Sequence, residues 1–301
     1  MKSFIYDRYG YDVNVNEGSF TYKDFVFKIE RVEKSEEELR VINDLCQNIT
    51  HDTFAKVASI CTNRNNVFLT PYEDYNVVLV SVEKFHVSFD DVIFFHRKYI
   101  SYLYQEEPIN LIDIKTRWIN KTSYIKEKVL NSFSMSSPYY DKLRKVTLYM
   151  LGYADNAIQY LEDLIIDKGE KLTYLTIAHK RLRRLTSYDL CNPLNLVYDS
   201  PTRDLAELYK FHAISKEELL LSLNHYSFSS KDITFLLARL LYPTYLFDLL
   251  ETSYEEKKDI HRYIELIYLN LSSQISSLAY IYKVIKQKYM IRPIHFLENK
   301  R

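Results

Sequence analysis

The sequence predicts an α+β protein with a small N-terminal lobe on an antiparallel sheet and a large, mainly helical C-terminal lobe. Two observations carry this prediction. Alternating apolar and polar residues gather between about residue 20 and residue 83, as in β-strands, whereas the chain after Phe85 follows the helical period almost throughout. This change divides the chain into lobes of residues 1–84 and 85–301. At 301 residues the chain can bury a full core.

The N-terminal lobe is predicted to be a strand, a helix and then three antiparallel strands. The helix falls in "SEEELRVINDLCQNI", where Ser35 and Glu38 have the spacing of a capping box. The strand segments are separated by turn signals at "NRNN" and "YEDYN"; they are "FVFKIERV" (25–32), "KVASICT" (56–62), "NVFLTPY" (66–72) and "NVVLVSVE" (76–83).

The C-terminal lobe begins with a helix that Ser88 caps, in "SFDDVIFFHRKYISYLYQE". Two more helical patterns follow, and the second ends at Lys168 and Gly169. Residues 176–211, "TIAHKRLRRLTSYDLCNPLNLVYDSPTRDLAELYKF", are predicted to be the one long non-helical segment of this half, before further helices up to about Met290. Because loops on a rigid scaffold often carry function, a site is expected in this segment.

Composition excludes several classes of function. Forty basic and forty acidic residues cancel, so no net field favours nucleic acid or an anionic membrane. The N-terminus lacks the apolar core of a signal peptide, and no run approaches the roughly 18 apolar residues of a membrane span, which predicts cytoplasmic synthesis. Three widely spaced cysteines predict reduced thiols rather than disulfides or a zinc site. The glycines exclude a glycine-rich phosphate loop; they are Gly10, Gly18, Gly152 and Gly169.

Three segments resemble one known family: "TIAHKRL" (176–182), "LVYDSPTRDLAELYK" (196–210) and "ARLLYPTYLFDLLE" (238–251). Over most of residues 20–290 the chain resembles spore-coat proteins of the CotS and YutH type, which form part of the aminoglycoside-phosphotransferase branch of the protein-kinase-like fold. The resemblance implies a kinase-like two-lobe fold. It also implies a place in the spore coat, with other spore-coat proteins as partners.

The resemblance places His179 on the histidine that opens the catalytic loop of active relatives, and Arg181 on their catalytic aspartate. A guanidinium is not deprotonated in proteins, so Arg181 cannot be the base that accepts a proton from an attacking hydroxyl. Thr186 stands at the spacing of the family's metal-binding asparagine. These departures predict a degenerate catalytic loop, with no cofactor expected.

Two further positions match nucleotide- or metal-binding residues of the family. Asp199 matches its metal-binding aspartate and is expected to be partly exposed at a cleft, although it also fits a loop aspartate that caps the turn before Pro201. Lys28 matches the lysine that contacts the nucleotide phosphates, with a partner among Glu36–Glu38, of which Glu38 is the named candidate. A lysine on the outward face of an edge strand would give the same pattern.

Other features point to structure and association. The resemblance implies that Asp204 is buried and bonded to the backbone of the catalytic loop, and His179 is expected to be a hydrogen-bonding residue too. Four neighbouring cations form either a patch for phosphate, a polyanion or an acidic partner, or a solvated loop; they are Lys180, Arg181, Arg183 and Arg184. The 28 tyrosines suit protein contacts, and codon bias in an AT-rich genome is the alternative explanation.

The sequence therefore predicts a catalytically degenerate kinase-like protein that serves structure or assembly in the bacterial spore coat. The alternative is an active small-molecule phosphotransferase of the aminoglycoside or choline type, which would use ATP, Mg²⁺, Asp199 and an unusual base. A third hypothesis is a regulatory module that binds nucleotide without turnover. The sequence leaves the oligomeric state and the identity of the partners open.

Overall fold

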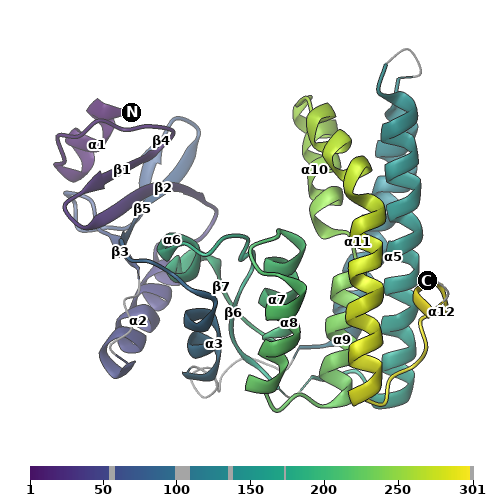
Figure 1. Cartoon of the computed structure of the whole chain (residues 1–301). Coiled ribbons are helices and arrows are strands. Elements are labelled where there is room, and N and C mark those ends of the chain that lie inside the picture. The colour runs from purple at the N-terminus through teal and green to yellow at the C-terminus, as the bar shows by residue number, and fades with distance from the viewer. Residues whose placement is uncertain (54–57, 99–108, 135–137, 173, 299–301) are drawn as a thin grey trace. The chain divides into compact units, whose positions relative to one another are not determined.

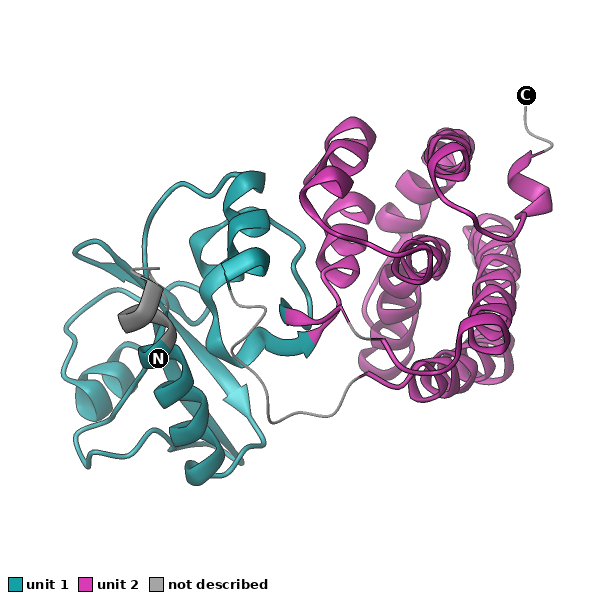
Figure 2. Cartoon of the chain, turned by 90° about the horizontal axis from the view of Figure 1, so that it is seen from below, with its two compact units in different colours: residues 1–103, 177–198 teal, residues 104–176, 199–301 magenta. Residues whose placement is uncertain are grey.

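The chain divides into two compact units. A computed structural model describes all 301 residues except 54–57, 99–108, 135–137, 173 and 299–301 (Figure 1). Unit 1 comprises residues 1–103 and 177–198, and unit 2 comprises residues 104–176 and 199–301 (Figure 2). The boundary expected after residue 84 differs from this division, because residues 85–103 and 177–198 form one compact unit with the N-terminal sheet.

Unit 1 is built on an antiparallel sheet in the order β1-β2-β5-β3, with β4 also pairing with β5. Central strand β5 has a continuous buried run, Val77–Val80, which explains its unbroken apolar sequence. The expected antiparallel sheet is confirmed, but its strands do not form a simple meander, because β3 and β4 both pair with β5, and β1 was not predicted. Residues 56 and 57 of one predicted strand lie outside the described residues. The strands are β1 (Ser19–Tyr22), β2 (Phe25–Val32), β3 (Ser59–Cys61), β4 (Thr70–Tyr72) and β5 (Tyr75–Glu83).

The helices of unit 1 begin at capped ends. In α2 (Glu36–Thr53) the predicted capping box is present: the Glu38 N–H donates to Ser35 Oγ at 3.2 Å, and the Ser35 N–H donates to Glu38 Oε2 at 2.8 Å. In α3 (Phe89–Lys98) Ser88 and Asp91 make the same pair of contacts. The predicted continuation of this helix beyond residue 98 lies outside the described residues. Helix α1 (Lys2–Tyr9), which was not predicted, buries Ile5 in the core.

Residues 177–198 pack on the sheet of unit 1. They contain most of β6 (Thr176–His179), which pairs with β7 (Leu196–Asp199), and between these strands lie α6 (Ser187–Cys191) and a 3-10 turn. Helix α6 contacts β5, and the Ala58 N–H donates to the Cys191 carbonyl at 3.4 Å. The prediction of one long non-helical segment is therefore wrong in part. Helix α6 is too short to show a period, and α7 (Thr202–Lys210) buries the polar Asp204 and Glu207 together with its apolar residues.

Unit 2 is helical in its described residues, which confirms the predicted α+β class with a mainly helical second part. Helix α9 lies at its centre, because it packs against both α5 and α7 and nearly all of its residues are buried. The helices of unit 2 besides α7 are α4 (Leu111–Tyr124), α5 (Tyr140–Lys168), α8 (Lys216–Ser222), α9 (Ser230–Leu241), α10 (Thr244–Glu256), α11 (His261–Lys288) and α12 (His295–Glu298) (Figure 1).

One helical stretch in the described residues, Ser230–Glu256, is long and apolar enough to cross a membrane by composition. It comprises α9 and α10, and Pro243 interrupts it. Of its most apolar window, 72% is buried inside the protein. This burial is what the core helix of a globular unit shows, so the stretch is weak evidence for a membrane span.

Candidate functional site

Unit 1 has a cavity of about 610 Å³ between strand β2 and the β6–β7 loop. Its lining is rich in charged and amide side chains, and it gathers two of the predicted site residues, Lys28 and Arg181. The other lining residues that bear on its chemistry are Glu30, Lys180, Tyr188, Asp189, Asn192 and Asn195. What this cavity can bind depends on the charges of these side chains and on the partners that each side chain already has.

Lys28 has a partner on its own strand. Its ammonium lies 2.8 Å from Glu30 Oε1 and 5.1 Å from the centre of the Tyr188 ring. The Tyr188 hydroxyl donates to the same Glu30 oxygen at 2.8 Å. Burial, and after it the Glu30 carboxylate, raises the pKa of Tyr188 above its usual range. The three residues form a balanced group in which Glu30 carries the counter-charge.

The glutamates that were expected to pair with Lys28 have other partners. Glu36 accepts the backbone N–H groups of Phe68 and Leu69 at 2.9–3.1 Å. Glu38 is engaged in the capping box, and the Ser35 N–H lowers the pKa of its carboxyl. The spacing in sequence could not distinguish these partners from Glu30, because alternate residues of a strand share one face and lie close together.

The loop after β6 is fixed by Asn195. Its side chain accepts a hydrogen bond from the Arg181 N–H at 3.0 Å and donates one to the Arg181 carbonyl at 2.8 Å. One side-chain amide therefore satisfies both backbone polar groups of that residue. The Arg181 guanidinium donates to the Lys180 carbonyl at 3.0 Å. At the position that the resemblance matched to a catalytic carboxylate, this chain therefore has a cation folded against its own loop. Asn195 was not among the predicted site residues, and its place just before the short strand β7 was the one available signal.

His179 and Thr186 both hold the loop. His179 is fully buried beside Phe95, with ring centroids 5.2 Å apart, and its Nε2 lies 2.7 Å from the Leu190 carbonyl. A carbonyl only accepts, so Nε2 carries the proton in this contact. Thr186 caps α6, because its Oγ1 accepts the Asp189 N–H at 3.1 Å. These contacts give both side chains a part in holding the loop.

Asp199, in unit 2, is held by two guanidinium groups. Arg203 Nη1 donates to its Oδ2 at 2.7 Å, and Arg239 Nη2 donates to its two oxygens at 2.8 and 3.0 Å. The Ser200 N–H adds a bond of 2.6 Å to Oδ1. Burial lowers the pKa of Arg239 and the carboxylate opposes this, but a guanidinium stays charged in proteins. The carboxylate is thus satisfied within unit 2.

The expectation that Asp199 is partly exposed is wrong, since its exposure is 3%. Magnesium is usually held by one or two carboxylates with phosphate oxygens and water. Both Asp199 oxygens accept from cations, so the donor set around it does not fit Mg²⁺. Asp204, on α7, has the expected burial, with an exposure of 0%. The sequence analysis quoted the segment that contains Arg239 and missed its part in this site.

Comparisons with known proteins agree with this architecture. A family model described as "Spore coat putative kinase YutH" matches residues 2–274. The chain is 30% identical over 141 residues to the endospore coat-associated protein YutH of Bacillus subtilis (strain 168). That alignment covers 42% of this chain and 42% of the relative's length, so the chain matches less than half of that curated protein.

Two solved structures are similar in fold. A spectinomycin phosphotransferase in complex with ADP and spectinomycin has a TM-score of 0.54 at 10% identity, and the match covers 99% of this chain and 95% of that chain. An aminoglycoside phosphotransferase from Alicyclobacillus acidocaldarius has a TM-score of 0.53 at 10% identity, with coverages of 89% and 92%. At this identity the likeness shows the fold alone, and it confirms the predicted kinase-like class.

Proposed function

The chain belongs to the YutH family of spore coat proteins, and we propose that it is a catalytically degenerate member that serves structure or assembly in the spore coat. The observation that carries this proposal is the state of Asp199. A carboxylate that is buried between Arg203 and Arg239 is a structural ion pair, and breaking it to bind a metal would leave two guanidinium groups uncompensated.

The catalytic loop supports the same proposal. Phosphoryl transfer depends on metal ions, positioned phosphates and an oriented nucleophile. Here Arg181 stands where a carboxylate would orient the nucleophile, and Glu30 balances Lys28. The β1–β2 hairpin closes with a two-residue turn, Lys23–Asp24, which contains no glycine to bring backbone N–H groups against a phosphate. No resident ATP or Mg²⁺ is required.

Protein contacts are the proposed mode of action. The cavity of unit 1 is lined by five cationic and three acidic side chains, and Lys180 and the neighbouring Arg184 are exposed. Such a surface favours an acidic partner through complementary charge. Other spore-coat proteins are the proposed partners, because the family and the curated relative are both described as spore-coat proteins.

Two measurements on the full chain test the loss of catalysis. The melting temperature should stay unchanged in millimolar ATP with Mg²⁺, since a ligand at 100 times its dissociation constant would add about 2.7 kcal/mol of stability. Formation of ADP from ATP should not exceed that of a blank, with spectinomycin or choline as acceptor.

If the protein is instead an active phosphotransferase, ATP should raise its melting temperature and turnover should be measurable. Wild-type turnover that disappears in Lys28→Ala and persists in Lys98→Ala would establish it, since both lysines lie at the surface of unit 1 but only Lys28 lines the cavity. A shift of several degrees with ATP, without turnover, would instead favour the nucleotide-binding regulatory module.

A further inference from the structure

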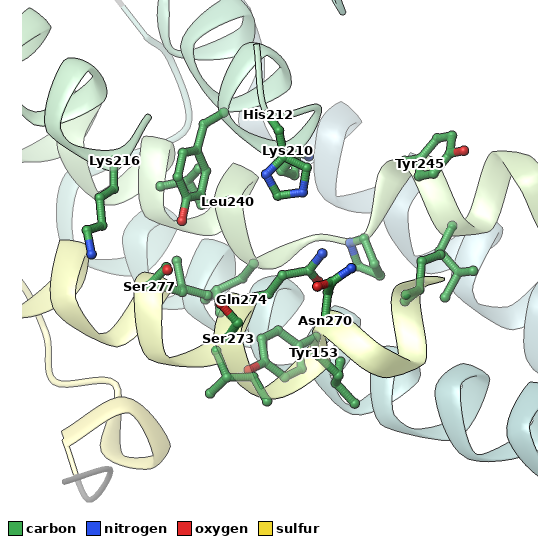
Figure 3. Close-up of a pocket in the computed structure, with 18 of the residues that line it drawn as sticks. Tyr153, Lys210, His212, Lys216, Leu240, Tyr245, Asn270, Ser273, Gln274 and Ser277 are labelled. Atoms are coloured by element: carbon green, nitrogen blue, oxygen red, sulfur yellow. The ribbon is translucent and has the colours of Figure 1, made fainter. Parts of the chain in front are cut away.

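Unit 2 contains a second cavity, of about 610 Å³, among α5, α7, α8, α9, α10 and α11 (Figure 3). Cavities of a few hundred cubic ångströms with an apolar lining and a few convergent polar groups are typical small-molecule sites. The apolar part of the wall comes mainly from Leu240, Leu241, Leu246, Ile275 and Leu278. None of the residues predicted from the sequence as site residues lines it.

One face of α11 supplies the polar wall. Asn270, Ser273, Gln274 and Ser277 follow the spacing i, i+3, i+4 and i+7, which places them on a single stripe of the helix, and all of them line the cavity. These side chains carry amides and hydroxyls but no charge. In Figure 3 the ends of Asn270 and Gln274 lie close together in the middle of the cavity.

His212 faces this stripe from the opposite wall, and its backbone is strained. It has a φ of 57°, in the left-handed region. Its N–H donates to the Tyr209 carbonyl, and the Ala213 N–H donates to the Leu208 carbonyl, which is the hydrogen-bond pattern of a Schellman motif at the end of α7. Glycine is the favoured residue at this position because it has no Cβ to clash.

A histidine at this position therefore makes the end of α7 less stable than a glycine would. In exchange it presents an imidazole that points toward Gln274 and Asn270 (Figure 3). Strained positions persist where the surroundings impose them, and they cluster at ligand sites. The histidine thus places an imidazole in the lining of the cavity, which glycine at this turn would not supply.

The charged residues of the wall already have partners. Lys210 Nζ donates to the carbonyls of Arg239 and Tyr242 and to Thr244 Oγ1, at 3.1–3.3 Å, which uses its three donors. Lys216 lies 3.7 Å from Glu217. Placing an ion in an apolar cavity without a counter-charge is unfavourable, so this wall disfavours a polycation as well as an unpaired anion.

We infer that the cavity of unit 2 binds an uncharged small molecule with an apolar ring body, whose amide or hydroxyl groups meet His212, Asn270 and Gln274. This site and its ligand are independent of whether unit 1 transfers phosphate.

Three probes of equal shape test the inference on the full chain: 2-naphthamide, 2-naphthoate and 2-naphthylmethylammonium. Dissociation constants are measured by ligand-observed NMR or calorimetry. The neutral amide is expected to bind about tenfold more tightly than either ion, because only the ions lose hydration without gaining a counter-charge.

Two pairs of variants locate the binding. Ser277→Trp fills the cavity and should abolish binding of the amide, whereas Ser276→Trp, on the exposed side of the same helix, should leave it unchanged. His212→Gly relieves the strained turn, so the melting temperature of the protein should stay the same or rise. The same variant should bind 2-naphthamide about tenfold more weakly. Gln274→Leu should weaken the binding of 2-naphthamide and leave the melting temperature unchanged within error.

The inference is overturned if the amide does not bind at millimolar concentration, or if an ion binds as tightly as the amide. It is also overturned if both tryptophan variants fold and bind alike, or if His212→Gly binds like the wild type. Should Ser277→Trp fail to fold, His212→Gly and Gln274→Leu decide the outcome.

Discussion

The side chains of Asp199 and Arg239 join the end of β7 to α9 through two hydrogen bonds, of 2.8 and 3.0 Å. The two residues are forty positions apart in the sequence. With Arg203, they form a largely buried group in which one carboxylate bridges two guanidinium groups. The aspartate that the resemblance suggested as a metal ligand is therefore part of the interior of unit 2.

Replacement of Asp199 should destabilise the protein strongly. Asp199→Ala removes the hydrogen-bonded carboxylate of the buried Arg239 and of the half-buried Arg203, and breaking a buried ion pair costs about 3–5 kcal/mol. Denaturant unfolding measures this loss. The matched control is Asp155→Ala, on the exposed side of α5, which should change stability by no more than about 0.5 kcal/mol. Equal stability of the two variants would show that Asp199 is not a structural ion pair.

Asp204→Ala should also destabilise the protein, by about 1–3 kcal/mol, since it removes a fully buried polar side chain and leaves its partners unsatisfied. Asp204→Asn, which keeps the volume but removes the charge, separates packing from electrostatics. If both variants unfold at the wild-type denaturant concentration, Asp204 has no structural role.

Asn195→Asp should loosen the loop after β6. The variant keeps an oxygen for the Arg181 N–H but loses the donor to the Arg181 carbonyl. We expect faster hydrogen exchange of the loop amides, by about tenfold, with global stability lowered by about 1 kcal/mol. Asn156→Asp, whose side chain donates to the Gly152 carbonyl on the exposed surface of α5, is the control. Unchanged exchange in Asn195→Asp would mean that other contacts hold the loop.

Removal of the loop arginines should weaken recruitment to the spore coat. The variant replaces Arg181, Arg183 and Arg184 by Ala, and the loss should grow smaller as salt is added, because exposed charges are screened. The control replaces three exposed arginines of unit 1 that do not line the cavity, Arg8, Arg40 and Arg97. Coat binding by fractionation or pull-down is compared after both variants are shown to melt like the wild type. Equal recruitment of the loop variant and the control variant would mean that the loop is only a solvated turn and does not bind a partner.

Local sequence patterns determined the elements that depend on near neighbours. The alternation of apolar residues predicted the antiparallel sheet, and Ser35 with Glu38 predicted the start of α2, because a capping box needs only residues three apart. That Arg181 stands at the position of a carboxylate is what the resemblance of the quoted segments to a known family implies. The family itself was recognised from those segments.

Only the tertiary structure decided which partners the charged residues have. Glu30 rather than Glu38 pairs with Lys28, and Arg239 reaches Asp199 from another helix. The assignment of residues 177–198 to the sheet unit likewise depends on packing between segments distant in sequence. Periodicity reports which face of an element is apolar, whereas ion pairs and cavities depend on how the faces of separate elements meet. For this reason the sequence by itself determined the fold class, whereas only the tertiary structure decided that Asp199 is buried and paired with Arg203 and Arg239.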